Sequence, residues 1–137
     1  MRYLIDTNIL ILFVNEEEML SNDVRYILND CENIIYVSSE SIKEFIHLLQ
    51  NNKIELGKEF RSRNIFDIIE NTLGFHVKYV AKEHLVILAT LDLVEGHNDP
   101  NDRLIISQAI TENIPLISSD TKFPKYKKFG LDFIPNR

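Results

Sequence analysis

Four acidic residues lie at positions where the fold could bring their negative charges close together. Asp6 follows the apolar run that ends at Ile5, and apolar residues resume at Ile9. Burying a lone carboxylate in such surroundings is costly unless something compensates its charge. The other three acids lie at expected boundaries between elements: Glu44, Asp102 and Asp120. If the fold gathers all four, they form a site for positive charge.

Gathered carboxylates predict a site for a hard divalent cation. Two unit charges about 4 Å apart repel by about 4 kcal/mol at an effective dielectric of 20, so the cluster must bind cations or take up protons. Carboxylates without histidine or cysteine partners suit Mg²⁺ or Mn²⁺, which complete their coordination with water and phosphate oxygens. These donors are typical of metal-assisted phosphodiester hydrolysis.

Each acid also has a purely structural interpretation. Asp6 or Asn8 is suited to cap the helix that follows. The segments 41–44 and 99–102 both have the spacing of a capping box, and Asp120 could close a turn. For a single position the structural interpretation is favoured. For all four, at matched ends of alternating elements, a shared site is favoured.

The elements that would position these acids alternate along the chain. Apolar periodicity, caps and turn residues predict strands at 1–5, 34–37, 75–80, 114–120 and 131–134, and helices at about 9–14, 24–31, 41–51, 64–73, 82–94 and 100–113. This order predicts an α/β fold with a mostly parallel sheet of four to five strands and helices on both faces. In such a sheet, strand ends and the following helix starts meet at the carboxyl edge.

Composition limits the class of protein. The chain has 137 residues, 45% hydrophobic and 26% charged, which predicts one globular domain over residues 1–137. We expect no membrane span and no secretory signal, and Cys31 is the only cysteine. A reducing cytoplasm is therefore the expected location. The net charge of −6 argues against a general nucleic-acid binder but not against a nuclease whose acids surround a metal.

The histidines and the C-terminal lysines are less specific. The histidines lack a zinc-like spacing, and for His97, beside the acidic loop, a loop hydrogen bond is favoured over a phosphate contact. In the segment 121–130, lysines including Lys122 and Lys125 alternate with aromatic residues. Such a segment can bind RNA, but aromatic packing with solvated lysines is favoured, and the two can coexist. Arg103 could pair with a phosphate or with a neighbouring acid.

Taken in order, the motifs resemble those of the PIN domain, and more closely those of VapC-type toxins of bacterial toxin–antitoxin pairs. The resemblance covers nearly the whole chain. It rests on Asp6-Thr7-Asn8, on Glu44 after Ser38-Ser39, on the segment 99–105 with the preceding His97, and on Ser118-Ser119-Asp120. It implies a PIN-like three-layer sandwich and a Mg²⁺- or Mn²⁺-dependent endoribonuclease. It also implies an RNA substrate, a cognate antitoxin and a homodimer.

The resemblance assigns roles by position. Asp6, Glu44 and Asp102 match the three core acids, and Asp120 matches a more variable fourth. Asp6 and Asp102 would be the chief metal ligands, with the other two completing the site directly or through water. Supporting roles fall to Thr7, Asn8, Asp99 and Ser118, and possible RNA contacts to Arg103, Lys122 and Lys125. Asn101 departs from the pattern, because relatives often have an aromatic residue there.

Two other functions remain open from the sequence alone. A haloacid-dehalogenase-like phosphatase would use Asp6 as nucleophile, but such enzymes have a second aspartate two residues later, where this chain has Asn8. A non-catalytic module with the same fold is the other alternative. The chemistry of the residues does not separate RNA from DNA, since hydrolysis by activated water needs no 2′-hydroxyl.

Overall fold

A five-stranded parallel sheet forms the centre of the computed structural model, which describes residues 1–60 and 63–137. The strand order is β3-β2-β1-β4-β5, and each neighbouring pair is parallel. The strands are β1 Arg2–Ile5, β2 Ile34–Ser38, β3 His76–Lys78, β4 Leu116–Ser118 and β5 Phe133–Pro135. The predicted α/β class and parallel sheet are confirmed.

Helices connect the strands. They are α1 Thr7–Asn15, α2 Asn22–Asn29, α3 Ser39–Gln50, α4 Ile65–Asp67, α5 Lys82–Thr90 and α6 Pro100–Glu112. Shorter turns of helix are η1 Glu17–Met19, η2 Lys58–Phe60, the π-helical η3 Ile68–Thr72 and η4 Phe123–Phe129. Within the described residues, none of these helices has the length and apolar character needed to cross a membrane.

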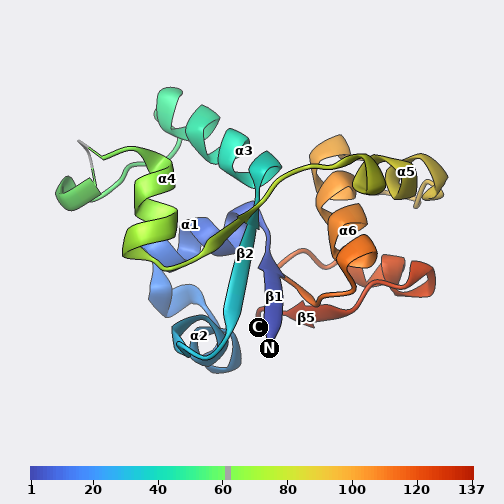
Figure 1. Cartoon of the computed structure of the whole chain (residues 1–137), viewed down its shortest axis with the longest axis horizontal. Coiled ribbons are helices and arrows are strands. Elements are labelled where there is room, and N and C mark those ends of the chain that lie inside the picture. Colours follow the sequence, from blue (N-terminus) through green and yellow to red (C-terminus); the bar gives the residue numbers. More distant parts are fainter. Residues whose placement is uncertain (61–62) are drawn as a thin grey trace.

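Two cores lie on opposite faces of the sheet, and β1 contributes to both. Tyr3 and Ile5 pack with residues of α1, α2 and α3, whereas Leu4 packs with residues of α6, β4 and β5. This alternation follows from the period of two along a strand. Figure 1 shows α1 to α4 on one side of the strands and α5 with α6 on the other. The sheet is thus the middle layer of three.

Local sequence explains where several helices begin and end. The Ser21 side chain caps α2 by accepting from the Val24 amide. At α6, Asp99 caps and Pro100 takes the first helical position, as the sequence predicts. The same helix ends at Asn113, whose φ of 54° is left-handed, a conformation that asparagine tolerates better than most residues.

Several predicted boundaries are wrong, among them the following three. Helix α3 begins at Ser39 instead of near residue 41, because the Ser38 hydroxyl accepts from the Glu40 amide. The capping-box interpretation of 41–44 therefore fails. Helix α5 stops at Thr90 instead of Val94, and the carbonyls of the next two residues accept hydrogen bonds from Arg103. The strand predicted for 75–80 is paired only over β3.

Candidate active site

The four predicted acids come together at the carboxyl edge of the sheet. Asp6 follows β1 and Asp120 follows β4, while Glu44 and Asp102 lie near the starts of α3 and α6. Their charges reach one another: Asp102 and Asp120 both raise the pKa of Asp6, and Asp102 raises the pKa of Glu44. Carboxylates from four separate elements therefore share one region of negative potential.

Asp6 is buried between β1 and β4 and has both oxygens engaged. Its Oδ1 accepts from the Ile9 amide at 2.9 Å, which makes Asp6 the cap of α1. Its Oδ2 accepts from the Ser118 hydroxyl at 2.5 Å. Burial is the main cause that raises the pKa of Asp6 to about 6; the charges of Asp102 and Asp120 contribute to the rise, and the two hydrogen bonds oppose it. The capping role is confirmed, and the same side chain also belongs to the acid cluster.

Glu44 projects from the second turn of α3 and is half-buried. Burial is the first cause that raises its pKa, and the charges of Asp102 and Asp99 follow. The Thr7 hydroxyl donates to Glu44 Oε2 at 3.4 Å, and this hydrogen bond lowers the pKa of Glu44. Thr7, for which the resemblance implies a supporting role, therefore contacts Glu44.

Asp102 lies in the first turn of α6 beside the capping residue. Asp99 Oδ1 accepts from the amides of Asn101 and Asp102, at 2.9 and 3.2 Å. Burial raises the pKa of Asp102, and the charges of Asp99 and Asp120 add to this, while His97 lowers it. Asp99 thus has the capping role expected for it, and its charge also reaches the cluster.

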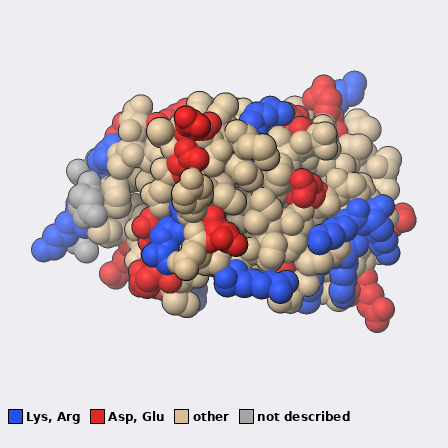
Figure 2. Space-filling model, turned by 90° about the horizontal axis from the view of Figure 1, so that it is seen from below, with Lys and Arg blue, Asp and Glu red and all other residues tan. Residues whose placement is uncertain are grey.

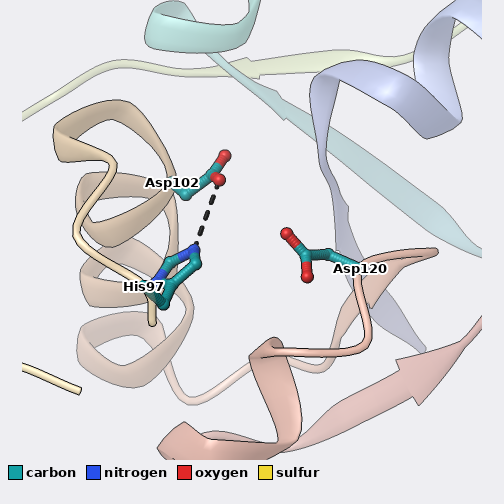
Figure 3. Close-up of side chains that lie close together, drawn as sticks. All are labelled: His97, Asp102 and Asp120. Atoms are coloured by element: carbon teal, nitrogen blue, oxygen red, sulfur yellow. Dashed lines mark hydrogen bonds and ion pairs between the residues drawn. The ribbon is translucent and has the colours of Figure 1, made fainter. Parts of the chain in front are cut away.

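His97, Asp102 and Asp120 form the tightest group of possible metal ligands. One ligand atom from each lies within 4.8 Å of the others. Figure 3 shows the imidazole and the two carboxylates turned toward a common space, with His97 Nε2 3.3 Å from Asp102 Oδ2. The sequence missed His97 as a member of this group. Its place just before the 99–105 motif was the available signal, but the spacing alone favoured a loop contact.

Two further supporting residues differ in what they contact. Ser118 links two acids, since its hydroxyl donates to Asp6 and accepts from the Asp120 amide at 3.0 Å. Asn8 is exposed on the first turn of α1. Ser118 therefore fixes the geometry of the site, whereas Asn8 faces solvent near it.

Arg103 points into the protein, where it contacts two backbone carbonyls and a phenol. It is 7% exposed and donates to the carbonyls of Leu91 and Asp92 and to the Tyr126 hydroxyl. Its guanidinium is thus committed to holding the loop after α5 against α6. The buried guanidinium is therefore occupied by these contacts and is not placed to bind RNA.

The C-terminal lysines are exposed, and their aromatic neighbours are largely buried. Phe123 and Tyr126 are at most 1% exposed and belong to the core on the α6 side. The exposed lysines of this segment are Lys122, Lys125, Lys127 and Lys128. Figure 2 shows basic side chains gathered at the end of the molecule where η4 lies. The favoured packing interpretation is confirmed, and RNA binding by the lysines stays a prediction.

A divalent cation fits the donors at this edge. Burial and mutual repulsion raise the pKa of Asp6, Glu44 and Asp102, so each carboxylate would be stabilised by a nearby positive charge. The oxygen atoms are those that Mg²⁺ and Mn²⁺ prefer. The tightest group also offers one imidazole nitrogen.

Comparison with known proteins identifies the family and the fold. A family model of the PIN domain matches residues 3–129. VapBC2 of Rickettsia felis, solved with a promoter DNA fragment, has 23% identity and a TM-score of 0.70, covering 100% of both chains. VapBC-1 of nontypeable Haemophilus influenzae has 21% identity and a TM-score of 0.66, covering 98% of both.

A third structure is VapBC-5 of Mycobacterium tuberculosis, described as a member of the VapBC family of toxin–antitoxin systems. It has 16% identity and a TM-score of 0.59, with 99% of this chain and 98% of that chain covered. At these identities the likeness concerns the fold. The search of curated proteins gave no significant match.

Proposed function

Because this chain belongs to the PIN-domain family, we propose that it is a Mg²⁺- or Mn²⁺-dependent endoribonuclease that acts as the toxin of a toxin–antitoxin pair. One observation supports this most directly: acids from four separate elements act on one another through their charges at one edge of the sheet, and three of them have a raised pKa. A divalent ion stabilises the charged form of carboxylates whose pKa is raised in this way.

Each acid has a defined task in this proposal. Asp6 and Asp102 hold the ion, and Glu44 and Asp120 complete the site directly or through water. When bound, the ion supplies a Lewis acid that polarises the phosphodiester and activates a water molecule. Hydrogen bonds of Ser118 hold Asp6 and the Asp120 backbone in position, and a hydrogen bond from Thr7 holds Glu44. The exposed lysines Lys122 and Lys125 would contact the RNA backbone near Asp120.

The biological partners follow from similarity. Structures with the same fold are of VapBC proteins, and one is described as part of a toxin–antitoxin system. We therefore propose a cognate antitoxin as a partner, a homodimer as the assembled form, and the cytoplasm as the place of action. A small DNA-binding protein encoded next to this chain would support the pairing.

The decisive test is cleavage of RNA by an Asp6→Asn variant. Asparagine keeps an oxygen for the Ile9 amide and removes the negative charge, so the helix cap survives while metal binding is weakened. We expect EDTA-sensitive cleavage by the wild-type protein and a loss of at least 100-fold in the variant, the order found for removing one catalytic group. Asp23→Asn, an exposed acid of α2, is the matched control. Full activity of Asp6→Asn would contradict the proposal.

The two alternatives have less support. The phosphatase alternative lacks the second aspartate two residues after Asp6, where this chain has the exposed Asn8. Trapping of an aspartyl-phosphate on Asp6 would revive that alternative. A non-catalytic module would leave purified, antitoxin-free protein unable to bind Mn²⁺, which calorimetry can measure.

A further inference from the structure

His97 lies beside the acids with its ring held firmly by the core. The side chain is 6% exposed and packs edge-to-face against Phe123 and Tyr126, with ring centroids 5.6 and 5.3 Å away. A ring so confined has little freedom to turn. Its Nε2 atom is directed at Asp102, toward the space shared with Asp120 (Figure 3).

The phenol of Tyr126 is placed to support the tautomer of His97 that a metal-bound imidazole needs, with the proton on Nδ1. A phenol has one proton to donate and two lone pairs that accept. Arg103 Nη1 donates to its oxygen at 3.3 Å, so one lone pair is used. The same oxygen lies 2.6 Å from His97 Nδ1 and 3.4 Å from the His97 carbonyl oxygen.

A neutral imidazole with its proton on Nδ1 is compatible with these three contacts, because Nδ1 donates to the phenol and the phenol proton reaches the His97 carbonyl. In the other tautomer the phenol donates to Nδ1, and Nε2 donates its proton to Asp102 Oδ2, 3.3 Å away. When Nε2 binds a metal ion in place of that proton, Nδ1 carries the proton and donates to Tyr126, so the surroundings of the ring suit the tautomer that leaves a lone pair on Nε2.

With this tautomer, two acceptors face each other across the site. Nε2 of His97 and Oδ2 of Asp102 are 3.3 Å apart, and a carboxylate oxygen of Asp120 lies within 4.8 Å of both. Bonds of about 2.0 to 2.2 Å from one metal ion allow two ligand atoms to lie at most about 4.4 Å apart, so the 3.3 Å pair of His97 and Asp102 fits one ion as it stands. A shared cation would therefore satisfy both acceptors.

We propose that His97 is a metal ligand through Nε2, which makes this centre a mixed nitrogen–oxygen site selective for Mn²⁺ or another first-row transition ion over Mg²⁺. Imidazole favours transition metals, whereas Mg²⁺ prefers oxygen. The Tyr126 contact on Nδ1 resembles the outer hydrogen bond that orients most metal-bound histidines. The inference rests on the proposed function and specifies which divalent ion that function uses. It also corrects the expectation of a site made of carboxylates alone.

The test is pulsed electron paramagnetic resonance of the full chain loaded with one equivalent of Mn²⁺. A directly bound imidazole adds nuclear modulation from ¹⁴N to the Mn²⁺ signal. We expect this modulation in the wild-type protein and its loss in His97→Asn, because asparagine retains a polar atom near the position of Nδ1 but has none at Nε2. Incorporation of ¹⁵N-histidine into the unmutated chain should change the modulation to that of ¹⁵N, so the test does not depend on folding of the variant.

His84→Asn is the matched control. His84 is also buried, at 2% exposed, and its Nε2 lies 3.2 Å from a carboxylate oxygen of Glu112, in an ion pair between α5 and α6. Its replacement should leave the ¹⁴N modulation intact. Calorimetry adds a second readout: His97→Asn should weaken Mn²⁺ binding at least about tenfold and Mg²⁺ binding by less.

The outcomes separate this inference from the proposed function. Mn²⁺ bound without histidine modulation overturns the role of His97 and leaves the nuclease proposal standing. Histidine modulation in a protein that cleaves no RNA supports His97 as a metal ligand and contradicts the proposed nuclease activity. Failure to bind Mn²⁺ at all overturns both.

Discussion

Asp6 has two roles that the sequence presents as alternatives. One oxygen caps α1, and the other is held by Ser118 at the acid cluster. A single carboxylate thus joins the end of β1, the start of α1 and the end of β4. Because it is buried and close to Asp102 and Asp120, its charged form is disfavoured until a cation is present.

This raised pKa predicts how stability changes with pH in the metal-free protein. For an acid whose pKa rises from 3.8 to about 6 on folding, the stabilising contribution is complete below pH 3.8 and is lost as the pH rises through about 6. At 1.36 kcal/mol per pKa unit, the difference is about 3 kcal/mol. In EDTA, Asp6→Asn should therefore gain stability relative to wild type between pH 4 and pH 8, by up to about that amount.

Urea denaturation at the two pH values measures this effect. Asp23→Asn, exposed on α2, should follow the wild-type pH dependence. If Asp6→Asn also follows the wild type at both pH values, Asp6 is not the source of the dependence. Adding Mn²⁺ at pH 8 should stabilise the wild-type protein more than the Asp6→Asn variant.

At the scale of residues, position along the chain predicts which acids meet but not what else joins them. Asp6, Glu44, Asp102 and Asp120 could be named because boundaries of alternating elements meet at one sheet edge. Arg103 and His97 could not be placed, since both depend on Tyr126, more than twenty residues away. Such contacts follow from packing of η4 against α6, for which the local pattern carries no signal.

Among the elements, the start of α6 combines a cap with part of the electrostatics of the site. Asp99 accepts from two amides of the first turn, and its charge raises the pKa of Glu44 and Asp102. Two substitutions separate these roles. Asp99→Asn keeps the cap and removes the charge, whereas Asp99→Ala removes both.

We expect Asp99→Asn to change the free energy of unfolding by less than about 0.5 kcal/mol and Asp99→Ala to lower it by about 1 kcal/mol. Both should lower the pKa of Asp102, because the same negative charge is lost. Urea denaturation and carboxyl ¹³C titration measure the two effects. An equal loss of stability in both variants would mean that the cap contributes through charge alone.

The starts of some helices could be predicted from local sequence. Ser21 and the Asp99–Pro100 pair indicate their helices locally, through caps that need no tertiary contact. The end of α5 is not predicted by the local pattern, because the carbonyls of Leu91 and Asp92 accept hydrogen bonds from Arg103, eleven or more residues further along the chain. Ser38, assigned to a strand, also caps α3, a double role that strand periodicity cannot reveal.

Across the whole molecule, charge is divided between an acidic site and a basic end. The chain carries a net charge of −6, yet four exposed lysines lie together around η4, next to Asp120 in the sequence. An acidic protein that acts on RNA needs such a local region, because phosphate binding depends on nearby cations and on the release of counterions.

Replacing both Lys122 and Lys125 by glutamine should therefore weaken RNA binding and its salt dependence. For single-stranded RNA, each lost phosphate contact reduces the slope of log K against log salt by about 0.7, so two contacts give about 1.4. Fluorescence anisotropy with labelled RNA, in an Asp6→Asn background that prevents cleavage, provides the measurement. Lys53 and Lys82, exposed elsewhere, supply a charge-matched double variant. An unchanged slope in the first pair would argue against RNA contact there.

The short strands at the two edges of the sheet bear on how copies of the protein meet. β3 and β5 are each three residues long, and β5 ends at Pro135, which has no N–H to donate. Long, open edges invite strand addition, fibre growth and exchange of segments between molecules, and short edges with proline discourage them. A concentrated solution of this protein should therefore resist amyloid-like aggregation, and lasting pairing between copies should use helix and loop surfaces instead of a shared backbone ladder.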